Sequence, residues 1–226
     1  MSTETGGPPA ARRNTLSRAK VVTAAVAMAD ASDGKVPSTR KLAERLGVQA
    51  MALYHHFRNK DALLDGMVDF VFAEVELPAE GDDWKPAMRR RAASMREALI
   101  RHPWAIAIMD SRANPGPATL RHHDAVIGCL RAGEFTIAGA AHAFSLLDSY
   151  VYGFVVQELA LPLDSPEEIQ ESAESVLALA PPEKFPHLTE MAVEHAMKPG
   201  YAYADEFWIG LDLILDGLEL RRDAWR

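Results

Sequence analysis

Residues 38–64, STRKLAERLGVQAMALYHHFRNKDALL, decide the fold. Ser38 is of the type that caps a helix N-terminus, and Gly47 can adopt the left-handed conformation that ends a helix after Leu46. Only two residues then separate this helix from a second short helix, which is expected over 50–56. The spacing predicts a helix-turn-helix, whose second helix enters the DNA major groove.

Helices on both sides of this stretch complete a small unit. Ser17 is the expected N-cap of a first helix, and Asn59 is the expected N-cap of a fourth helix over 60–75. Apolar residues recur in both at helical spacing, so each helix needs neighbours to cover one face. We predict a DNA-binding domain over 15–75, after a disordered tail at 1–14 that has no signal-peptide core.

The charge is distributed unevenly along the chain. The chain has 24 Lys and Arg against 32 Asp and Glu, yet residues 1–60 hold ten of the basic residues and only four of the acidic ones. Basic residues neutralise phosphates and release counterions, so this asymmetry favours DNA binding by the N-terminal unit. A solvated basic face without a partner is the alternative.

The remaining composition excludes several classes of protein. The single cysteine, Cys129, excludes an internal disulfide and a Cys-based zinc cluster, and it fits a reducing cytoplasm. We therefore expect a cytoplasmic protein with no cofactor and no metal. The apolar stretch 135–157 is interrupted by polar residues, which indicates a buried helix rather than a membrane span.

Side chains around the helix-turn-helix are of the types that contact DNA. Arg40 can reach a guanine edge or a phosphate, and Gln49 can reach an adenine edge. Lys60 adds a cation beside the free N–H groups at the start of the fourth helix. The alternative interpretation makes Tyr54 a core aromatic and His56 an incidental surface residue.

A larger helical domain is predicted over 76–226, after a hinge at 77–83 that is rich in Pro, Gly and acidic residues. No alternating strand pattern or internal repeat is found, so the whole fold is expected to be all-α. Prolines interrupt 161–199, which is expected to be a looser, mobile region with one or two short helices. The other predicted helices cover 84–101, 104–109, 117–132, 136–159 and 205–222.

The N-terminal stretch resembles the DNA-binding signature of the TetR family of transcriptional regulators. By this resemblance Arg40 matches a base-contacting position, while Thr39, Tyr54, His56 and Lys60 match phosphate-contacting positions. The motifs that match without a gap are TRKLA at 39–43, LGV at 46–48, ALY at 52–54 and NKDALL at 59–64.

The recognition helix departs from the tetracycline-responsive pattern of the family, which implies a different operator. Ala50 offers only an apolar contact, such as to a thymine methyl group. The predicted DNA-contacting residues are Ser38, Thr39, Arg40, Gln49, Ala50, Met51, Tyr54, His56 and Lys60.

The resemblance continues more weakly into the second domain, which it identifies as a dimerisation and effector-binding domain. The wide apolar stripe of the last helix suggests that helices 136–159 and 205–222 pair with their twins in a symmetric dimer. Burial of both helices within one chain is the alternative. The stripe consists of Phe207, Leu211, Ile214 and Leu218, and the resembling segments are 98–105, 128–135, 146–158 and 207–219.

An effector cavity is implied by the resemblance alone. The metal-binding position of the tetracycline-responsive members falls on Met109, so a metal-chelated tetracycline is not expected, and a larger apolar or aromatic ligand is. Core packing or surface salt bridges are the alternative roles for these residues. The candidate pocket residues are Arg91, Met95, Trp104, Met109, Arg112, Phe144, Asp148 and Gln157.

Two rival functions complete the set of hypotheses. One is a DNA-binding regulator that uses no small-molecule effector. The other is an enzyme built on Cys129, His142 and Asp148, which the six-residue offset between the last two opposes, because it places them on different helix faces. The sequence thus predicts a homodimeric regulator, a repressor that a small apolar or aromatic effector releases from a pseudo-palindromic operator.

Overall fold

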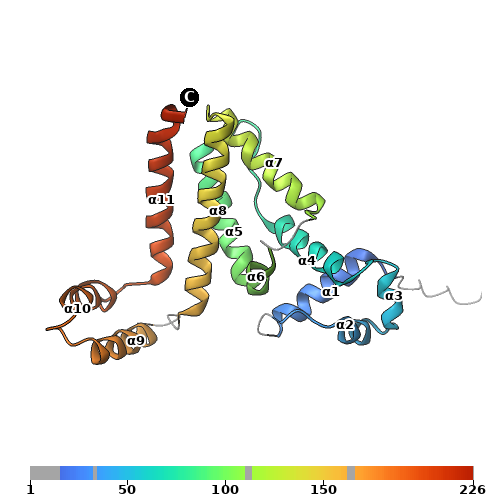
Figure 1. Cartoon of the computed structure of the whole chain (residues 1–226), viewed down its shortest axis with the longest axis horizontal. Coiled ribbons are helices and arrows are strands. Elements are labelled where there is room, and N and C mark those ends of the chain that lie inside the picture. The colour runs from blue at the N-terminus through green and yellow to red at the C-terminus, as the bar shows by residue number, and fades with distance from the viewer. Residues whose placement is uncertain (1–15, 33–34, 110–113, 162–165, 226) are drawn as a thin grey trace, which may run out of the picture.

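The computed structural model describes residues 16–32, 35–109, 114–161 and 166–225, and every regular element in these ranges is helical (Figure 1). The predicted all-α fold is confirmed. The predicted tail at 1–14 lies outside the described residues. Within the described ranges, no helix combines the length and apolar character that a membrane span requires.

The N-terminal helices begin and end at the predicted signals. The side chains of Ser17, Ser38 and Asn59 each accept a backbone hydrogen bond as N-caps. Gly47 has a φ of 67°, a conformation open to glycine at little cost, and it ends the second helix. The four helices are α1 (Arg18–Asp30), α2 (Thr39–Leu46), α3 (Ala50–Tyr54) and α4 (Lys60–Glu74).

Helix α3 is shorter than predicted and ends at Tyr54. The backbone amides of His56 and Phe57 both donate to the carbonyl of Leu53, which turns the chain toward α4. Leu53 and Phe57 are buried beneath this turn, where they join the apolar faces of α1 and α4. The short helix is thus held to the domain by its own turn.

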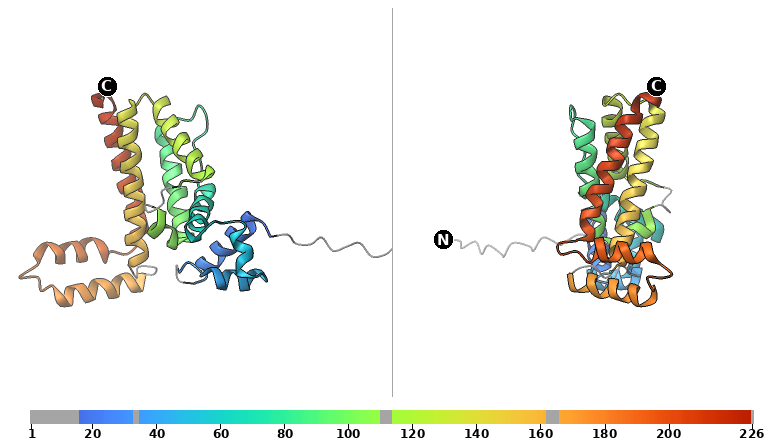
Figure 2. Two further views of the ribbon diagram at one scale, coloured as in Figure 1. Left: turned by 45° about the vertical axis from the view of Figure 1, so that its right-hand side comes forward. Right: turned by 90° about the vertical axis from the view of Figure 1, so that its left-hand side faces the viewer.

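Four long helices form the larger part of the molecule. They lie side by side in a bundle that α4 joins at one end (Figures 1 and 2). A turn of 3₁₀ helix, η1 (Pro103–Ala105), and α6 (Ile106–Met109) follow the first of them. The four helices are α5 (Trp84–Arg101), α7 (Pro117–Ala132), α8 (Ile137–Ala160) and α11 (Tyr203–Arg221), and a short 3₁₀ turn, η3 (Arg222–Trp225), follows α11.

The structure corrects the predicted role of the apolar stripe on α11. Phe207, Leu211 and Leu218 are at most 2% exposed, because α5 and α8 of the same chain cover them. The interpretation of this stripe as an interface between chains is therefore wrong. The apolar side chains that this chain leaves uncovered lie on the other side of α11, where Leu213 is 69% exposed and Ile209 is 55% exposed.

A helical arm replaces the loose region expected over 161–199. It contains α9 (Pro166–Leu179), α10 (Pro186–Met191) and a π-helical turn (Ala192–Ala196), and it projects from the bundle (Figure 2). Two of the prolines do not interrupt helices, because Pro166 and Pro186 lie in first helical turns, where no backbone N–H is needed.

A polar cluster joins the DNA-binding helices to the bundle. The buried His102 ring has Nδ1 2.8 Å from Asp30 Oδ1 of α1 and Nε2 3.2 Å from Glu74 Oε2 of α4. Trp104 Nε1 donates to Asp30 at 2.6 Å, and Arg101 donates to Glu74 at 2.7 Å. Burial alone raises the pKa of Glu74, but hydrogen bonds from Arg101 and His102 outweigh it and lower the pKa. The cluster fixes the ends of α1 and α4 against the end of α5.

Candidate DNA interface and ligand cavity

The predicted DNA-contacting residues lie on one accessible part of the helix-turn-helix. Met51 is 70% exposed and Tyr54 is 46% exposed, whereas Phe57 is 4% exposed and fills the core. The interpretation of Tyr54 as a core aromatic is therefore wrong. Six of the nine residues are exposed, namely Ser38, Arg40, Gln49, Met51, Tyr54 and Lys60, and three are half-buried, namely Thr39, Ala50 and His56.

Two cations of this surface are free to move toward DNA. Arg40 Nε lies 3.1 Å from Glu44 Oε1, and the two side chains are 88% and 63% exposed, so the pair costs little to break. Lys60 is the first residue of α4, where the Asn59 side chain accepts from the Ala62 amide at 2.8 Å. The surface can therefore offer two flexible cations to phosphates or base edges.

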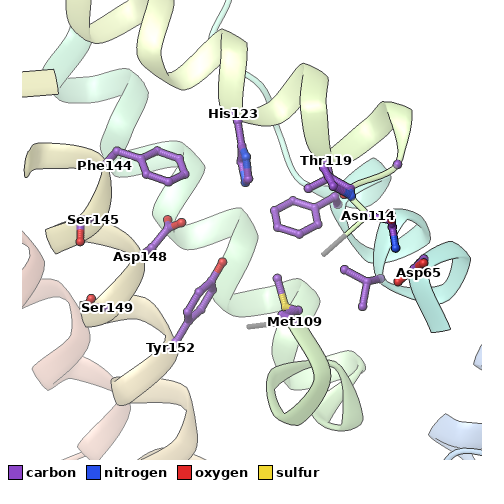
Figure 3. A pocket seen from close by; sticks show the side chains of 14 residues that line it. Asp65, Met109, Asn114, Thr119, His123, Phe144, Ser145, Asp148, Ser149 and Tyr152 are labelled. Atoms are coloured by element: carbon purple, nitrogen blue, oxygen red, sulfur yellow. The ribbon is translucent and has the colours of Figure 1, made fainter. Parts of the chain in front are cut away.

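A cavity of about 570 Å³ lies between α4, α6, the start of α7 and the middle of α8. Figure 3 shows Phe144, Asp148 and Tyr152 of α8 facing His123 and Thr119 of α7 across it. The rings of His123 and Phe144 meet edge to face, with centroids 5.1 Å apart. The remaining lining residues are Asp65, Val68, Phe72, Met109, Asn114, Pro115, Gly116, Ser145 and Ser149.

A buried charged network lies behind the α8 wall of the cavity. Arg91 of α5 is 1% exposed, and its Nη2 lies 2.5 Å from Asp148 Oδ1. Arg91 Nε donates to His122 Nε2 at 2.9 Å, so this histidine accepts at Nε2. Burial, with the nearby charges of Arg91 and His123, lowers the pKa of His122 to about 2. His122 is therefore neutral and Asp148 is the carboxylate that balances Arg91.

Three of the predicted pocket residues line the cavity, namely Met109, Phe144 and Asp148. Arg91 lies behind the wall, and Arg112 lies outside the described residues. The structure does not bring the other three to the cavity. Met95 is buried in the bundle core, Trp104 donates to Asp30 at the domain junction, and Gln157 is exposed and accepts from Tyr203 at 3.1 Å.

Sequence reasoning missed most of the polar lining. Ser145, Asp148, Ser149 and Tyr152 recur at three- and four-residue intervals on an otherwise apolar helix, which places them on one face. This polar stripe was the available signal. No sequence signal indicated His123, because its place in the wall depends on how α7 crosses α4.

A contact between α4 and α7 lies beside the cavity. Asp69 Oδ1 of α4 accepts from the backbone amide of Thr119 at 2.8 Å and from its hydroxyl at 3.1 Å. Gly116 allows this approach, because a Cβ there would overlap the Asp69 carboxylate. Thr119 and Gly116 line the cavity, and Asp69 and Gly116 also line an open groove between α1, α4 and the start of α7. The Asp69–Thr119 contact therefore lies between the cavity and the open groove.

Two family models cover most of this chain. Residues 36–67 match the model of bacterial regulatory proteins of the tetR family, and residues 77–222 match the tetracyclin repressor-like C-terminal domain. The chain belongs to the TetR family. This TetR protein is therefore a DNA-binding transcriptional regulator, and its family is not one of enzymes.

Relatives of known sequence or structure agree with this assignment. The tetracycline repressor protein class A from transposon 1721 of Escherichia coli is 33% identical over 191 residues, 82% of each chain. An HTH-type transcriptional regulator of Saccharopolyspora erythraea is 38% identical over 144 residues, 63% of this chain and 61% of that protein. The Streptomyces coelicolor TetR family protein ActR, in complex with actinorhodin, superposes with a TM-score of 0.77 at 26% identity, covering 91% of this chain and 98% of ActR.

Proposed function

We propose that this TetR regulator is a homodimeric repressor that a small, largely aromatic ligand releases from its operator. The cavity between α4, α7 and α8 carries the proposal, because α4 begins at the recognition unit and also forms a cavity wall. Its volume of about 570 Å³ is within the range of sites for drug-sized ligands. The proposal divides the chain near residue 76 into a DNA-binding part and an effector-binding part.

The lining supports an aromatic ligand. Phe72, Phe144, Tyr152 and His123 surround the space, and Met109 provides a polarisable thioether. Two similar structures hold small-molecule ligands: ActR is in complex with actinorhodin, and a variant of TetR from Acinetobacter baumannii is in complex with minocycline. Among the described residues no group of three or more His, Cys, Asp and Glu is arranged to hold a metal ion.

The Asp69–Thr119 contact supports a route from ligand to DNA. A ligand that moves Thr119 or Gly116 changes the place at which α7 holds α4, and α4 carries Lys60 and packs on α1. Ligand and operator then favour different positions of α4, so each weakens binding of the other reciprocally. We therefore assign the coupling between ligand and operator to the Asp69–Thr119 contact, which lies at the edge of the cavity.

The outer face of the bundle supports the dimer. Helices α8 and α11 lie together on one side of the molecule (Figure 2), and this side carries apolar residues that nothing within the chain covers. A pair of such faces would form a four-helix interface with twofold symmetry. The exposed apolar residues are Leu146, Val156 and Leu159 on α8 and Ile209, Leu213 and Leu220 on α11.

Selection of bound DNA from a random pool, followed by anisotropy titration of the selected duplex, tests this function. The expected result is a pseudo-palindromic site whose half-sites are about 10 base pairs apart or a multiple of this. Addition of an aromatic ligand that raises the melting temperature of the protein should weaken the complex. A ligand that binds the protein but leaves operator affinity unchanged would favour the rival function, a regulator without a small-molecule effector.

A further inference from the structure

The α8 wall of the cavity exposes the Asp148 carboxylate, whereas the arginine that pairs with it is buried. The side chain of Asp148 is 13% exposed and faces the cavity between Phe144 and Tyr152 (Figure 3). Arg91, its ion-pair partner, is 1% exposed and is not among the residues that line the cavity. A ligand can therefore touch the anion of this pair but not the cation.

The network behind the wall pairs this carboxylate with a buried cation. A guanidinium remains charged at every physiological pH, and Arg91 is fully buried, so it requires a neighbouring anion. His122 cannot take that role, because it is a neutral acceptor of the Arg91 Nε hydrogen bond. Asp148 is the carboxylate in contact with Arg91 among the described residues, so loss of its charge would leave the Arg91 guanidinium buried without a counter-charge.

The surroundings of Asp148 suit a cation more than an anion. Tyr152 lies one turn after it, and aromatic faces attract positive charge. Phe144 lies one turn before it and already has the Arg91 guanidinium over its ring, with Cζ 6.0 Å from the centroid. Burial lowers the pKa of His123 on the opposite wall, the charge of Asp148 opposes this effect, and the charge of Arg91 adds to it, so the imidazole supplies no fixed positive charge. A second carboxylate, that of Asp65, also lines the cavity.

We propose that Asp148 selects effectors in which an aromatic ring system carries a positively charged amine, and that it discriminates against aromatic carboxylates. The ammonium group would donate to the exposed edge of the Asp148 carboxylate while the rings lie among Phe144, Tyr152 and His123. A charge-assisted hydrogen bond of this kind is stronger than a neutral one. The inference rests on the proposed function only in taking this cavity as the effector site.

Two matched probes test the selectivity without any mutation. Aminomethyl-anthraquinone and the corresponding anthraquinone carboxylic acid share one ring system and differ in the sign of their charge at neutral pH. Calorimetric titration of the full-length protein should show the amine binding at least about tenfold more tightly. Equal affinities, a preference for the acid, or no binding of either probe would overturn the proposal.

Substitution of Asp148 gives the sharper result. In Asp148→Asn the buried Arg91 loses its counter-charge, so the order of the two probes should reverse. The matched control Asp124→Asn removes an exposed carboxylate of α7 that does not line the cavity and leaves the Arg91–Asp148 pair, so the order should be that of the native protein. The double variant Arg91→Met with Asp148→Leu removes both charges together, a replacement that buried ion pairs often tolerate, and it should bind both probes alike.

These outcomes are separate from those of the proposed function. If the native protein and a folded Asp148→Asn variant show the same probe preference, the selectivity assignment is wrong even though a ligand still releases the operator. If the probe preference reverses as expected but neither probe changes operator affinity, the selectivity stands and the proposed coupling fails. Thermal unfolding of each variant shows whether it is folded before the titrations are interpreted.

Discussion

The helix-turn-helix and the ligand cavity each contain an arginine–carboxylate pair, and the two pairs differ in every physical respect. Arg40 and Glu44 are neighbours on one helix and are 88% and 63% exposed. Arg91 and Asp148 come from different helices and are 1% and 13% exposed. The first pair can exchange its partner for DNA at little cost, whereas breaking the second leaves a buried charge. The Arg40–Glu44 pair of the DNA surface can therefore be exchanged for contacts with DNA, whereas the Arg91–Asp148 pair beside the cavity stays intact.

The largest expected effect is a loss of operator affinity when the two chains of the dimer separate while the helix-turn-helix and the cavity region of each stay folded. Leu213→Glu places a charge on the uncovered face of α11, where the native leucine is 69% exposed in this chain. The dimer should dissociate, and operator affinity should fall by about 10²- to 10⁴-fold, because two linked recognition units become single ones. Light scattering and anisotropy titration measure the two changes.

The matched control for this variant is Leu120→Glu, which charges an apolar residue of α7 that is 55% exposed. It should remain dimeric and bind the operator as the native protein does. A monomeric Leu213→Glu protein with native operator affinity would contradict the proposed dimer.

Removal of the Asp69 carboxylate should uncouple the two regions. Asp69→Ala loses both hydrogen bonds from Thr119 but changes neither the DNA surface nor the Asp148 wall. The native ligand-induced loss of operator affinity, typically about 5- to 150-fold in coupled systems, should shrink toward none. Titrations of operator with and without a bound ligand measure this factor.

Thr119→Ser keeps both donors to Asp69 and serves as the control, which should retain coupling. If Asp69→Ala couples ligand and operator as strongly as the native chain does, another contact between the bundle and α4 transmits the signal.

Acid should destabilise the protein through the buried His122 behind the cavity. The pKa of His122 falls from 6.5 to about 2 on folding. Between these two values the unfolded chain is protonated at His122, whereas the folded chain is not. The free energy of unfolding should therefore decline by about 1.4 kcal/mol for each pH unit below about 6, and this loss is absent at pH 7 and above. Denaturant melts at pH 7, 6 and 5 measure the slope.

His122→Gln retains an acceptor for Arg91 and should flatten this slope. His187→Gln is the matched control, because His187 is 97% exposed and should contribute little. Equal slopes for the native protein and His122→Gln would show that another group is responsible for the loss.

The smallest effects are expected on the DNA surface, where each contact is one of several. Arg40→Ala should cost about 1 kcal/mol, the lower end of the range for a base contact, and should relax preference at one base position. Lys60→Ala should weaken binding to all sequences and reduce the salt slope by about one. Selection experiments and salt titrations distinguish the two, and identical loss of specificity in both would contradict the roles given to them.

The same contrast explains how much the sequence could predict. Ser17, Ser38, Asn59 and Gly47 act on residues within four positions of themselves, so the helix-turn-helix was predictable almost residue by residue. The cavity depends on which faces of four helices meet. Trp104 has the composition of a pocket residue, yet its N–H is bonded to Asp30 across 74 positions of the chain.

Helix α11 illustrates a further limit. It has apolar residues on two sides, and sequence periodicity cannot say which side faces its own bundle. Phe207 and Leu211 were therefore assigned to an interface between two copies of the chain, although they are buried within one chain, while Leu213 is exposed. The polar stripe of α8 was visible in the sequence, but only the position of α7 shows that it lines a cavity.

The absence of a side chain at Gly116 has an evolutionary consequence. Because the Asp69 carboxylate occupies the space that a Cβ would need, position 116 is constrained by the link to α4 and not by the ligand. Ser145 and Ser149 line the same cavity from α8, a helix to which Asp69 makes no hydrogen bond among the described residues. If the cavity is the effector site, as proposed, mutations there would change which molecule binds and leave the Asp69–Thr119 contact intact, so new inducers could be acquired in single steps.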